Sequence, residues 1–380
     1  MSKSKGNVIN PMDLVTKYGS DAFRLGILRG RSAGMNQAFS ENSVIAGRNL
    51  CNKLWNISRL VQSIVDEESE KSISQHHAGA SSHFYNGHGR VADTEISGRD
   101  HLTRCENDDC APSTLRNAFS DPYTTLNMGE DWICRELNEC LKQVEHDMET
   151  YRFAEAVEVL YSTIWDKYAD WFLESQKIFK NADLLKRTLE TILIALHPFA
   201  PFVTEAIWQN LSWTNGFIAT ANWPTRLHYD PISAENFENI RTIVSEVRTT
   251  LQSLPGTNNG QKYALLYDND SLVNDNQLLI KTLTKVPSIN SLDGSPRGLR
   301  LALASHELYL DVPAKVVEEY KDALTEKILS VGRELDSLNL RMGNPNYVAK
   351  APEHLVKETR DQIKEKEALI SRLKTQLSLI

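Results

Sequence analysis

Residues 317–342 read VEEYKDALTEKILSVGRELDSLNLRM, and this stretch decides the architecture at the C-terminal end of the chain. Apolar residues recur there every seven positions, a spacing typical of helices that pair as a coiled coil. A second run after Pro352 repeats the spacing, so the sequence predicts two paired helices. The repeating positions are Val317, Leu324, Val331 and Leu338, with Ile328, Leu335 and Met342, and then Val356, Ile363, Ile370 and Leu377.

The segment between these helices is a turn. Gly343-Asn344-Pro345-Asn346 supplies residues that favour chain reversal, and Pro352 marks the start of the second helix. A terminal coiled coil is more often a dimerisation device than an RNA-binding arm. A tight hairpin, however, buries its own apolar seam, so we expect an antiparallel arm within one chain.

Upstream of the arm, the pattern indicates a small α/β unit. We expect a helix from Asn236 to Leu254, a strand at Tyr263–Tyr267, a helix from Leu272 to Thr284 and a β-rich stretch over Leu299–Val312.

Further upstream, apolar residues at helical spacing predict a bundle of four or five helices. Pro198 and Pro201 interrupt the last of these patterns, so the chain should turn or kink there. All seven tryptophans lie between Trp55 and Trp223, which places the large aromatic core in the bundle. The helical patterns span Glu41–Val65, Trp132–Tyr151, Phe153–Phe179 and Ala182–Leu211.

The start of the chain and one internal segment differ from the bundle. Asn10–Ile27 has a helix-start signal followed by apolar residues at helical spacing, which predicts one short helix. Residues 66–127 are rich in Gly, Ser, His, Asn and Asp without sustained periodicity, which predicts a disordered insertion.

The predicted fold class is therefore mainly α, with four parts. They are a loop and helix at 1–35, a helical bundle at 36–230 with the insertion at 66–127, an α/β unit at 231–312 and the coiled-coil arm at 313–380.

Composition and charge indicate which kind of partner the protein binds. No apolar run is long enough to span a bilayer, and five cysteines fit a reducing cytoplasm. The net charge is −8, yet residues 1–60 carry nine Lys/Arg against three Asp/Glu, and residues 341–380 carry eight against five. Because electrostatic fields act locally, two separated basic regions suit a protein that meets phosphates at two places.

The opening Met1-Ser2-Lys3-Ser4-Lys5-Gly6-Asn7 has the residues of a mobile phosphate-binding loop. Lysine ammonium groups on such a loop can close over a triphosphate and stabilise the charge that builds as pyrophosphate leaves. Taken alone, the same residues also fit a solvated tail.

Four segments resemble landmarks of class I aminoacyl-tRNA synthetases, in order and over nearly the whole chain except 66–127. Residues 1–7 resemble the KMSKS signature loop without its first lysine. Residues 17–24, KYGSDAFR, are similar to the helix after that loop in the branch for valine, isoleucine and leucine. Residues 52–56, NKLWN, and 197–205, HPFAPFVTE, resemble landmarks of that branch's anticodon-binding bundle.

The arm tip selects a family within this branch. Residues 343–352, GNPNYVAKAP, resemble the tip of the tRNA-binding arm of valine-tRNA ligases, with Tyr347 where phenylalanine is usual. The isoleucine family resembles it less and is the alternative.

The resemblance implies roles for particular residues. Lys3 is the candidate catalytic residue that contacts the phosphates of ATP, bound with Mg, during valine activation. Ser2, Ser4 and Lys5 would complete the ATP site. The expected tRNA contacts are Arg31, Arg48, Arg59, Lys350, Lys357, Arg360 and Lys364.

Other constellations are weaker. Residues that could bind zinc, His76, His77, His83, His88, His101, Cys105 and Cys110, have irregular spacing, and we expect no metal site. Trp165, Trp171 and Phe172 follow helical spacing and are expected in the core, and Cys51, Cys134 and Cys140 are expected to be packed thiols.

The implied function is that of a valine-tRNA ligase, the ATP-dependent attachment of valine to its tRNA. The family's HIGH motif, amino-acid pocket and editing domain are absent from this sequence, so we expect this chain to be inactive alone and to need an N-terminal catalytic half. The expected protein is a cytoplasmic monomer that binds tRNA(Val). A non-catalytic tRNA-binding or coiled-coil scaffold protein is a further alternative.

Overall fold

A computed structural model describes residues 9–29, 39–80, 126–255, 262–292, 297–303 and 306–380. The chain forms two compact units. The first unit comprises the described parts of 1–127, with 139–161 and 181–226, and the second comprises 128–138, 162–180 and the described parts of 227–380. Within these residues, no helix has the length and apolarity needed to cross a membrane. The four-part division expected from the sequence stays a prediction.

The first unit is built from helices. They are α1 (Pro11–Tyr18), α2 (Ser20–Leu28), α3 (Glu41–Ala80), α5 (Phe153–Ser162), α7 (Ala182–Leu196), α8 (Pro201–Asn210), the 3-10 turn η5 (Ile218–Thr220) and the later part of α4 (Met128–Glu149). The interruption expected at Pro198 and Pro201 is present, because α7 ends at Leu196 and α8 begins at Pro201.

The single helix expected over Asn10–Ile27 is wrong, because the chain forms α1 and α2 instead. Asn10 caps α1 by accepting a hydrogen bond from the Met12 amide at 3.1 Å. Gly19 separates the helices with φ 94°, a conformation that residues with a Cβ rarely adopt.

Helix α3 runs to Ala80, beyond the expected end at Val65, so the first part of the predicted insertion is helical. Helix-favouring Glu and Lys residues follow Val65, and Lys71 forms ion pairs with Glu67 at 2.9 Å and Glu68 at 3.3 Å. The rest of that insertion, 81–125, lies outside the described residues.

Glycines bring α2 and α3 into close contact. A Cβ on Gly26 would lie 2.7 Å from the Val44 backbone, and one on Gly47 would lie 2.6 Å from the Ala22 carbonyl oxygen. Leu25, Val44 and Leu50 are fully buried around this crossing. The two helices therefore pack at a distance that only glycine permits.

The second unit contains the early residues of α4, followed by a continuous helical run that continues α5. This run passes through the π-helix η4 (Thr163–Phe172) into α6 (Leu173–Phe179), so the helical pattern over Phe153–Phe179 is confirmed. Trp171 and Phe172 are buried as expected, while Trp165 is half-buried.

The small α/β part of this unit follows α9 (Pro231–Ser253), which starts five residues before the expected Asn236 because Asp230 caps it by accepting from the Ile232 amide at 3.0 Å. Its four-stranded sheet has the order β2-β1-β4-β3, with β1 parallel to β2 and antiparallel to β4. The remaining elements are β1 (Leu265–Tyr267), α10 (Ser271–Asp275), α11 (Gln277–Thr284), β2 (Ile289–Ser291), β3 (Leu299–Arg300) and β4 (Leu308–Leu310).

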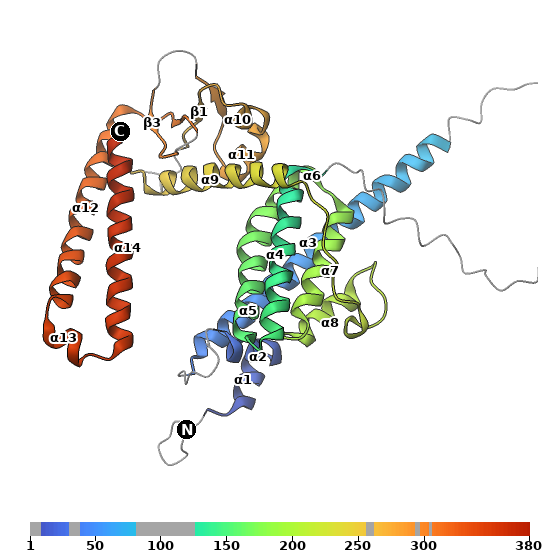
Figure 1. The fold of residues 1–380 in the computed structure, drawn as a ribbon. Coiled ribbons are helices and arrows are strands. Elements are labelled where there is room, and N and C mark those ends of the chain that lie inside the picture. Colours follow the sequence, from blue (N-terminus) through green and yellow to red (C-terminus); the bar gives the residue numbers. More distant parts are fainter. Residues whose placement is uncertain (1–8, 30–38, 81–125, 256–261, 293–296, 304–305) are drawn as a thin grey trace, which may run out of the picture. The chain divides into compact units, whose positions relative to one another are not determined.

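The C-terminal residues form a helical hairpin within one chain, as predicted. Helix α12 (Ala314–Met342) leads through the short α13 (Pro345–Lys350) into α14 (Glu353–Ser378), which returns alongside α12 (Figure 1). Tyr320, Leu324, Val331, Val356 and Leu373 are buried in its seam. The mainly helical fold with a small mixed sheet is therefore confirmed.

Candidate nucleic-acid interface

Two of the sequence landmarks meet in the first unit, although about 180 positions separate them. Asp21 of α2 accepts hydrogen bonds from the backbone amides of Phe202 at 3.3 Å and Val203 at 2.5 Å, in the first turn of α8. Arg24, one turn later, donates to the carbonyl oxygens of Pro198 at 3.0 Å and Phe199 at 3.1 Å. One side chain thus satisfies free amides of a helix start, and the other satisfies carbonyls of the preceding turn.

Asp21 is buried, and its environment has opposing effects on its pKa. Burial raises the pKa of Asp21 above its ordinary value, while the hydrogen bonds from Val203 and Phe202 and the charge of Arg24 act to lower it. A carboxylate at this position also faces the positive end of the α8 dipole. The contact is structural: it fixes α2, which follows the predicted ATP loop, against the bundle.

The predicted ATP-site residues Ser2, Lys3, Ser4 and Lys5 lie outside the described residues. The structure begins at the base of that loop, where α1 is tied to α3. Glu41 of α3 accepts from Lys17 Nζ at 2.9 Å and from the Tyr18 hydroxyl at 2.6 Å. The loop base is therefore anchored to the first helix of the bundle.

Two of the three predicted arginine contacts near the N-terminus lie on α3. Arg48 and Arg59 are exposed, whereas Arg31 lies outside the described residues. Eleven helical positions separate Arg48 from Arg59, which places them on the same helix face about 16 Å apart along the axis. The Arg48 guanidinium also lies 5.6 Å from the centre of the Tyr18 ring.

Trp55 lies between these arginines on the same face and is 38% exposed. An exposed indole flanked by cations is a suitable surface for RNA, because bases stack on aromatic rings while arginines contact phosphates. The sequence could not identify Trp55 as exposed, since its spacing also fits a core position. We define Arg48, Trp55 and Arg59 as the α3 stripe.

On the arm, three predicted contacts form a second exposed group. Lys357, Arg360 and Lys364 of α14 are all exposed and follow one face at spacings of three and four. We define them as the α14 stripe. The side chain of Lys350 lies outside the described side chains.

Other arm cations have protein partners. Lys366 Nζ lies 2.5 Å from Glu334 of α12, and Arg372 forms an ion pair with Glu246 of α9 at 3.3 Å. Sequence patterns could not reveal the partner of Arg372, because Glu246 lies 126 positions away.

The arm tip is fastened by Tyr347 of α13. Its hydroxyl lies 2.9 Å from Thr359 Oγ1 and 3.4 Å from the Leu355 carbonyl oxygen, both on α14. Thr359 is buried and donates to the same carbonyl at 2.8 Å. A phenylalanine at this position would have no hydroxyl and would lack this bond.

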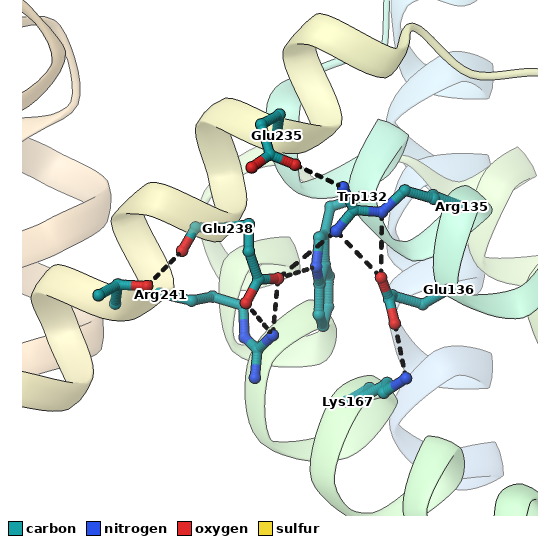
Figure 2. Close-up of polar contacts among 8 residues, drawn as sticks. Trp132, Arg135, Glu136, Lys167, Glu235, Glu238 and Arg241 are labelled. Atoms are coloured by element: carbon teal, nitrogen blue, oxygen red, sulfur yellow. Dashed lines mark hydrogen bonds and ion pairs between the residues drawn. The ribbon is translucent and has the colours of Figure 1, made fainter. Parts of the chain in front are cut away.

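A network of charged residues in the second unit joins α4, η4 and α9 (Figure 2). Glu238 accepts from Trp132 Nε1 at 2.8 Å and from Arg241 at 2.8 Å, while Arg135 pairs with Glu235 at 3.1 Å. Glu136 accepts from Lys167 at 2.6 Å. No sequence motif pointed to this network.

Helix α9 is held further by stacking on a tryptophan. The guanidinium groups of Arg241 and Arg248 lie 4.8 Å and 5.0 Å from the centre of the Trp171 ring. Arg248 also donates to the Leu283 carbonyl oxygen at 2.6 Å and 2.9 Å. Because a guanidinium attracts the face of an indole, these contacts fix α9 firmly to η4.

No group of metal-binding side chains occurs among the described residues. The histidines and cysteines considered for zinc lie in 81–125 or, for His76 and His77, have side chains outside those described. Cys51 is half-buried and Cys134 and Cys140 are buried, which fits packed thiols.

Family models match three parts of the chain. Residues 1–40 match "tRNA synthetases class I (I, L, M and V)", residues 130–262 match "Anticodon-binding domain of tRNA ligase", and residues 317–380 match "Valyl tRNA synthetase tRNA binding arm". The α14 stripe lies in the last of these matches.

Curated valine–tRNA ligases are similar to this chain over most of its length. Those of Pelagibacter ubique and Mycolicibacterium paratuberculosis are 28% and 29% identical over 95% of this chain, and that of Thermotoga maritima is 25% identical over 99%. The chain spans 38%, 37% and 39% of their respective lengths.

A solved structure, a ternary complex of Agrobacterium radiobacter K84 agnB2 LeuRS with tRNA and LeuAMS, matches 71% of this chain and 24% of its own. The sequence identity is 18% and the TM-score is 0.40. The sequence matches are ordered along the whole chain and agree with one another. Over nearly its whole length, this chain is therefore similar to valine–tRNA ligases, and its first 40 residues match the class I synthetase model.

Proposed function

We propose that this chain is the tRNA-binding part of a valine–tRNA ligase, which joins valine to tRNA(Val) with ATP. One observation carries the proposal: residues 317–380, which match the family's tRNA-binding arm, fold back as a hairpin with three exposed cations on one face. A hairpin that buries its own seam leaves its outer faces free for RNA.

The two stripes have different roles in binding tRNA. The α14 stripe contacts phosphates of the folded tRNA, and the α3 stripe contacts phosphates and stacks on an unpaired base. Phosphate contacts supply affinity and orientation, while base contacts supply selectivity. The four-part division at 1–35, 36–230, 231–312 and 313–380 belongs to this proposal.

ATP chemistry takes place at the N-terminal loop. The valine carboxylate attacks the α-phosphorus of ATP, the bond to the β-phosphate oxygen breaks, and pyrophosphate leaves with its electron pair. Lys3 stabilises the charge on the phosphates, Ser2 and Ser4 shape the loop, Lys5 assists, and Mg accompanies ATP. The clamp formed by Asp21 and Arg24 fixes α2, the second helix after this loop.

Binding to tRNA(Val) at rising salt tests the proposal. Replacing Lys357, Arg360 and Lys364 by alanine should weaken binding and reduce the slope of log affinity against log salt by about one for each phosphate that the variant no longer neutralises. The matched control replaces Lys315, Lys321 and Lys327 on α12, which are exposed and carry the same total charge. Equally weakened binding in both triple variants, or no binding at low salt, would contradict the proposal.

Two further measurements address the alternatives. Tighter binding of tRNA(Ile) than of tRNA(Val) would favour the isoleucine family.

ATP–pyrophosphate exchange tests the role of Lys3. When a catalytic half from a relative is added to this chain, exchange should appear in the mixture, and Lys3→Ala should abolish it. Sedimentation should show a monomer, and we place the protein in the cytoplasm.

A further inference from the structure

The root of the arm is attached to α9 by a buried carboxylate. Glu246 of α9 is only 9% exposed and accepts hydrogen bonds from Arg372 Nη2 and Gln376 Nε2, each at 3.3 Å. Arg372 and Gln376 are one helical turn apart near the end of α14. Thr250, the next residue on the same face of α9, lies 3.5 Å from the Glu246 carboxylate.

A second contact joins α9 to the other arm helix. The Ser253 hydroxyl at the end of α9 lies 3.1 Å from the hydroxyl of Tyr320, a buried residue near the start of α12. The C-terminal half of α9 thus contacts both helices of the hairpin at their root. Two contacts on different helices restrict both the swing and the rotation of the arm.

Helix α9 is also fixed to η4 and α4. Arg241 and Arg248 stack on Trp171, and Glu238 accepts a hydrogen bond from Trp132, as shown in part in Figure 2. Helix α9 is continuous from Pro231 to Ser253, and Arg248 lies between Glu246 and Ser253, the two residues that contact the arm. The same helix therefore connects the arm root to η4.

We propose that Glu246 is a positioning residue that sets the direction of the arm, so that the arm is presented to tRNA at one angle instead of swinging on a hinge. The inference rests on the proposed tRNA-binding function. Its physical basis is effective concentration: a fixed arm meets the second site on an RNA already bound elsewhere, whereas a loose arm meets it less often.

The charge distribution explains why Glu246 suits this role. A buried carboxylate without its cation is costly, so Glu246 favours the arm orientation in which Arg372 reaches it. The Arg372 side chain is 56% exposed and can be solvated when the pair opens. Opening the pair therefore costs free energy mainly because the Glu246 carboxylate would remain buried without its cation.

The first measurement follows the arm itself, without RNA. Spin labels at Asn239→Cys on α9 and Glu358→Cys on α14, both exposed positions, report one distance distribution in a background with the native cysteines replaced. Glu246→Ala should broaden this distribution clearly, and Arg372→Lys should preserve its width. An unchanged width in Glu246→Ala would overturn the inference.

The second measurement uses RNA and separates positioning from local contact. Glu246→Ala should weaken the binding of whole tRNA(Val) roughly three- to tenfold, because only the link between two sites is loosened. An RNA hairpin that carries only the outer corner of the tRNA should bind the variant as it binds the wild type. Weaker hairpin binding, or unchanged tRNA binding despite a broadened distribution, would contradict the positioning role.

If Glu246→Ala does not fold, the double variant with Arg372→Ala and Gln376→Ala replaces it, because it removes the same contacts at the arm root while Glu246 remains in place. The matched control is Lys374→Ala, which removes an exposed cation from the same turns of α14. Failure of the wild-type chain to bind tRNA would contradict the proposed function, while the label distances would still decide whether Glu246 fixes the arm.

Discussion

The Asp21 carboxylate accepts a hydrogen bond of 2.5 Å from the backbone amide of Val203, which lies 182 positions away in the sequence. This contact caps α8 with a side chain from α2 instead of one from its own start, where Ala200 offers no side-chain hydrogen bond. Helix α2, the second helix after the predicted ATP loop, and the HPFAPFVTE segment of the bundle are thereby held together.

We expect Asp21→Ala to lower the free energy of unfolding by about 1–2 kcal/mol, because the first amides of α8 lose their acceptor. Asp21→Asn should have a smaller effect, since its side-chain oxygen can still accept. Urea unfolding provides the measurement. Glu139→Gln, at an exposed position on α4, is the control and should have almost no effect.

The stability difference between wild type and Asp21→Asn should depend on pH. Burial raises the pKa of Asp21, so the folded state binds the proton more tightly than the unfolded state. The contribution of Asp21 is full below the ordinary carboxyl pKa and falls as pH rises through the raised value. Urea unfolding midpoints of both proteins should be measured from acidic to neutral pH. The midpoint of the wild type relative to that of Asp21→Asn should fall as pH rises, and a rise with pH would contradict the raised pKa of Asp21.

The crossing of α2 and α3 should not tolerate a methyl group. Gly26→Ala and Gly47→Ala each place a Cβ against backbone at 2.7 Å or less, so each should cost about 1–3 kcal/mol of stability. Gly332→Ala on α12 is the matched control. Nothing lies within 4 Å of its Cβ, and it should stabilise the arm by about 0.5–1 kcal/mol, because glycine disfavours helix. Thermal unfolding of the three variants tests the contrast.

Tyr347→Phe should loosen the arm tip. The variant keeps the ring but lacks the hydroxyl that lies 2.9 Å from Thr359, at an expected cost of about 0.5–1.5 kcal/mol. Amide hydrogen exchange should accelerate in α13 and at Ala351 while the arm root is unchanged. In a double-mutant cycle with Thr359→Val, fully additive effects would show that the two hydroxyls do not interact.

Cys51 should resist alkylation in the folded protein. Burial raises the pKa of its thiol to about 12, and the nearby charge of Asp21 adds to this shift, so almost no thiolate forms at pH 8. Peptide mass spectrometry after iodoacetamide treatment should show little modification of Cys51 in native protein and complete modification in urea. Rapid native labelling would contradict the described environment.

Much of the secondary structure follows from local patterns. The seven-residue repeat from Val317 and Val356 predicts the hairpin, and Pro198 and Pro201 predict the break before α8. Two helix boundaries differ from those predicted. Gly19 divides the first predicted helix in two, and Glu67, Glu68 and Lys71 extend α3 beyond its predicted end. The ATP residues Ser2 to Lys5 and the contact Arg31 lie outside the described residues, so their roles stay predictions.

The sequence alone determined the mainly helical fold, the self-paired arm and the resemblance to valine–tRNA ligases. Heptad spacing, prolines and short motifs involve residues close together in the chain, so they can be recognised without the tertiary structure. Only the tertiary structure shows that Asp21 caps α8 and that Arg372 pairs with Glu246. It also shows that Trp55 is exposed between Arg48 and Arg59. These contacts join residues far apart in the chain. Their partners are set by how helices pack, and helical spacing alone does not distinguish a buried face from an exposed one.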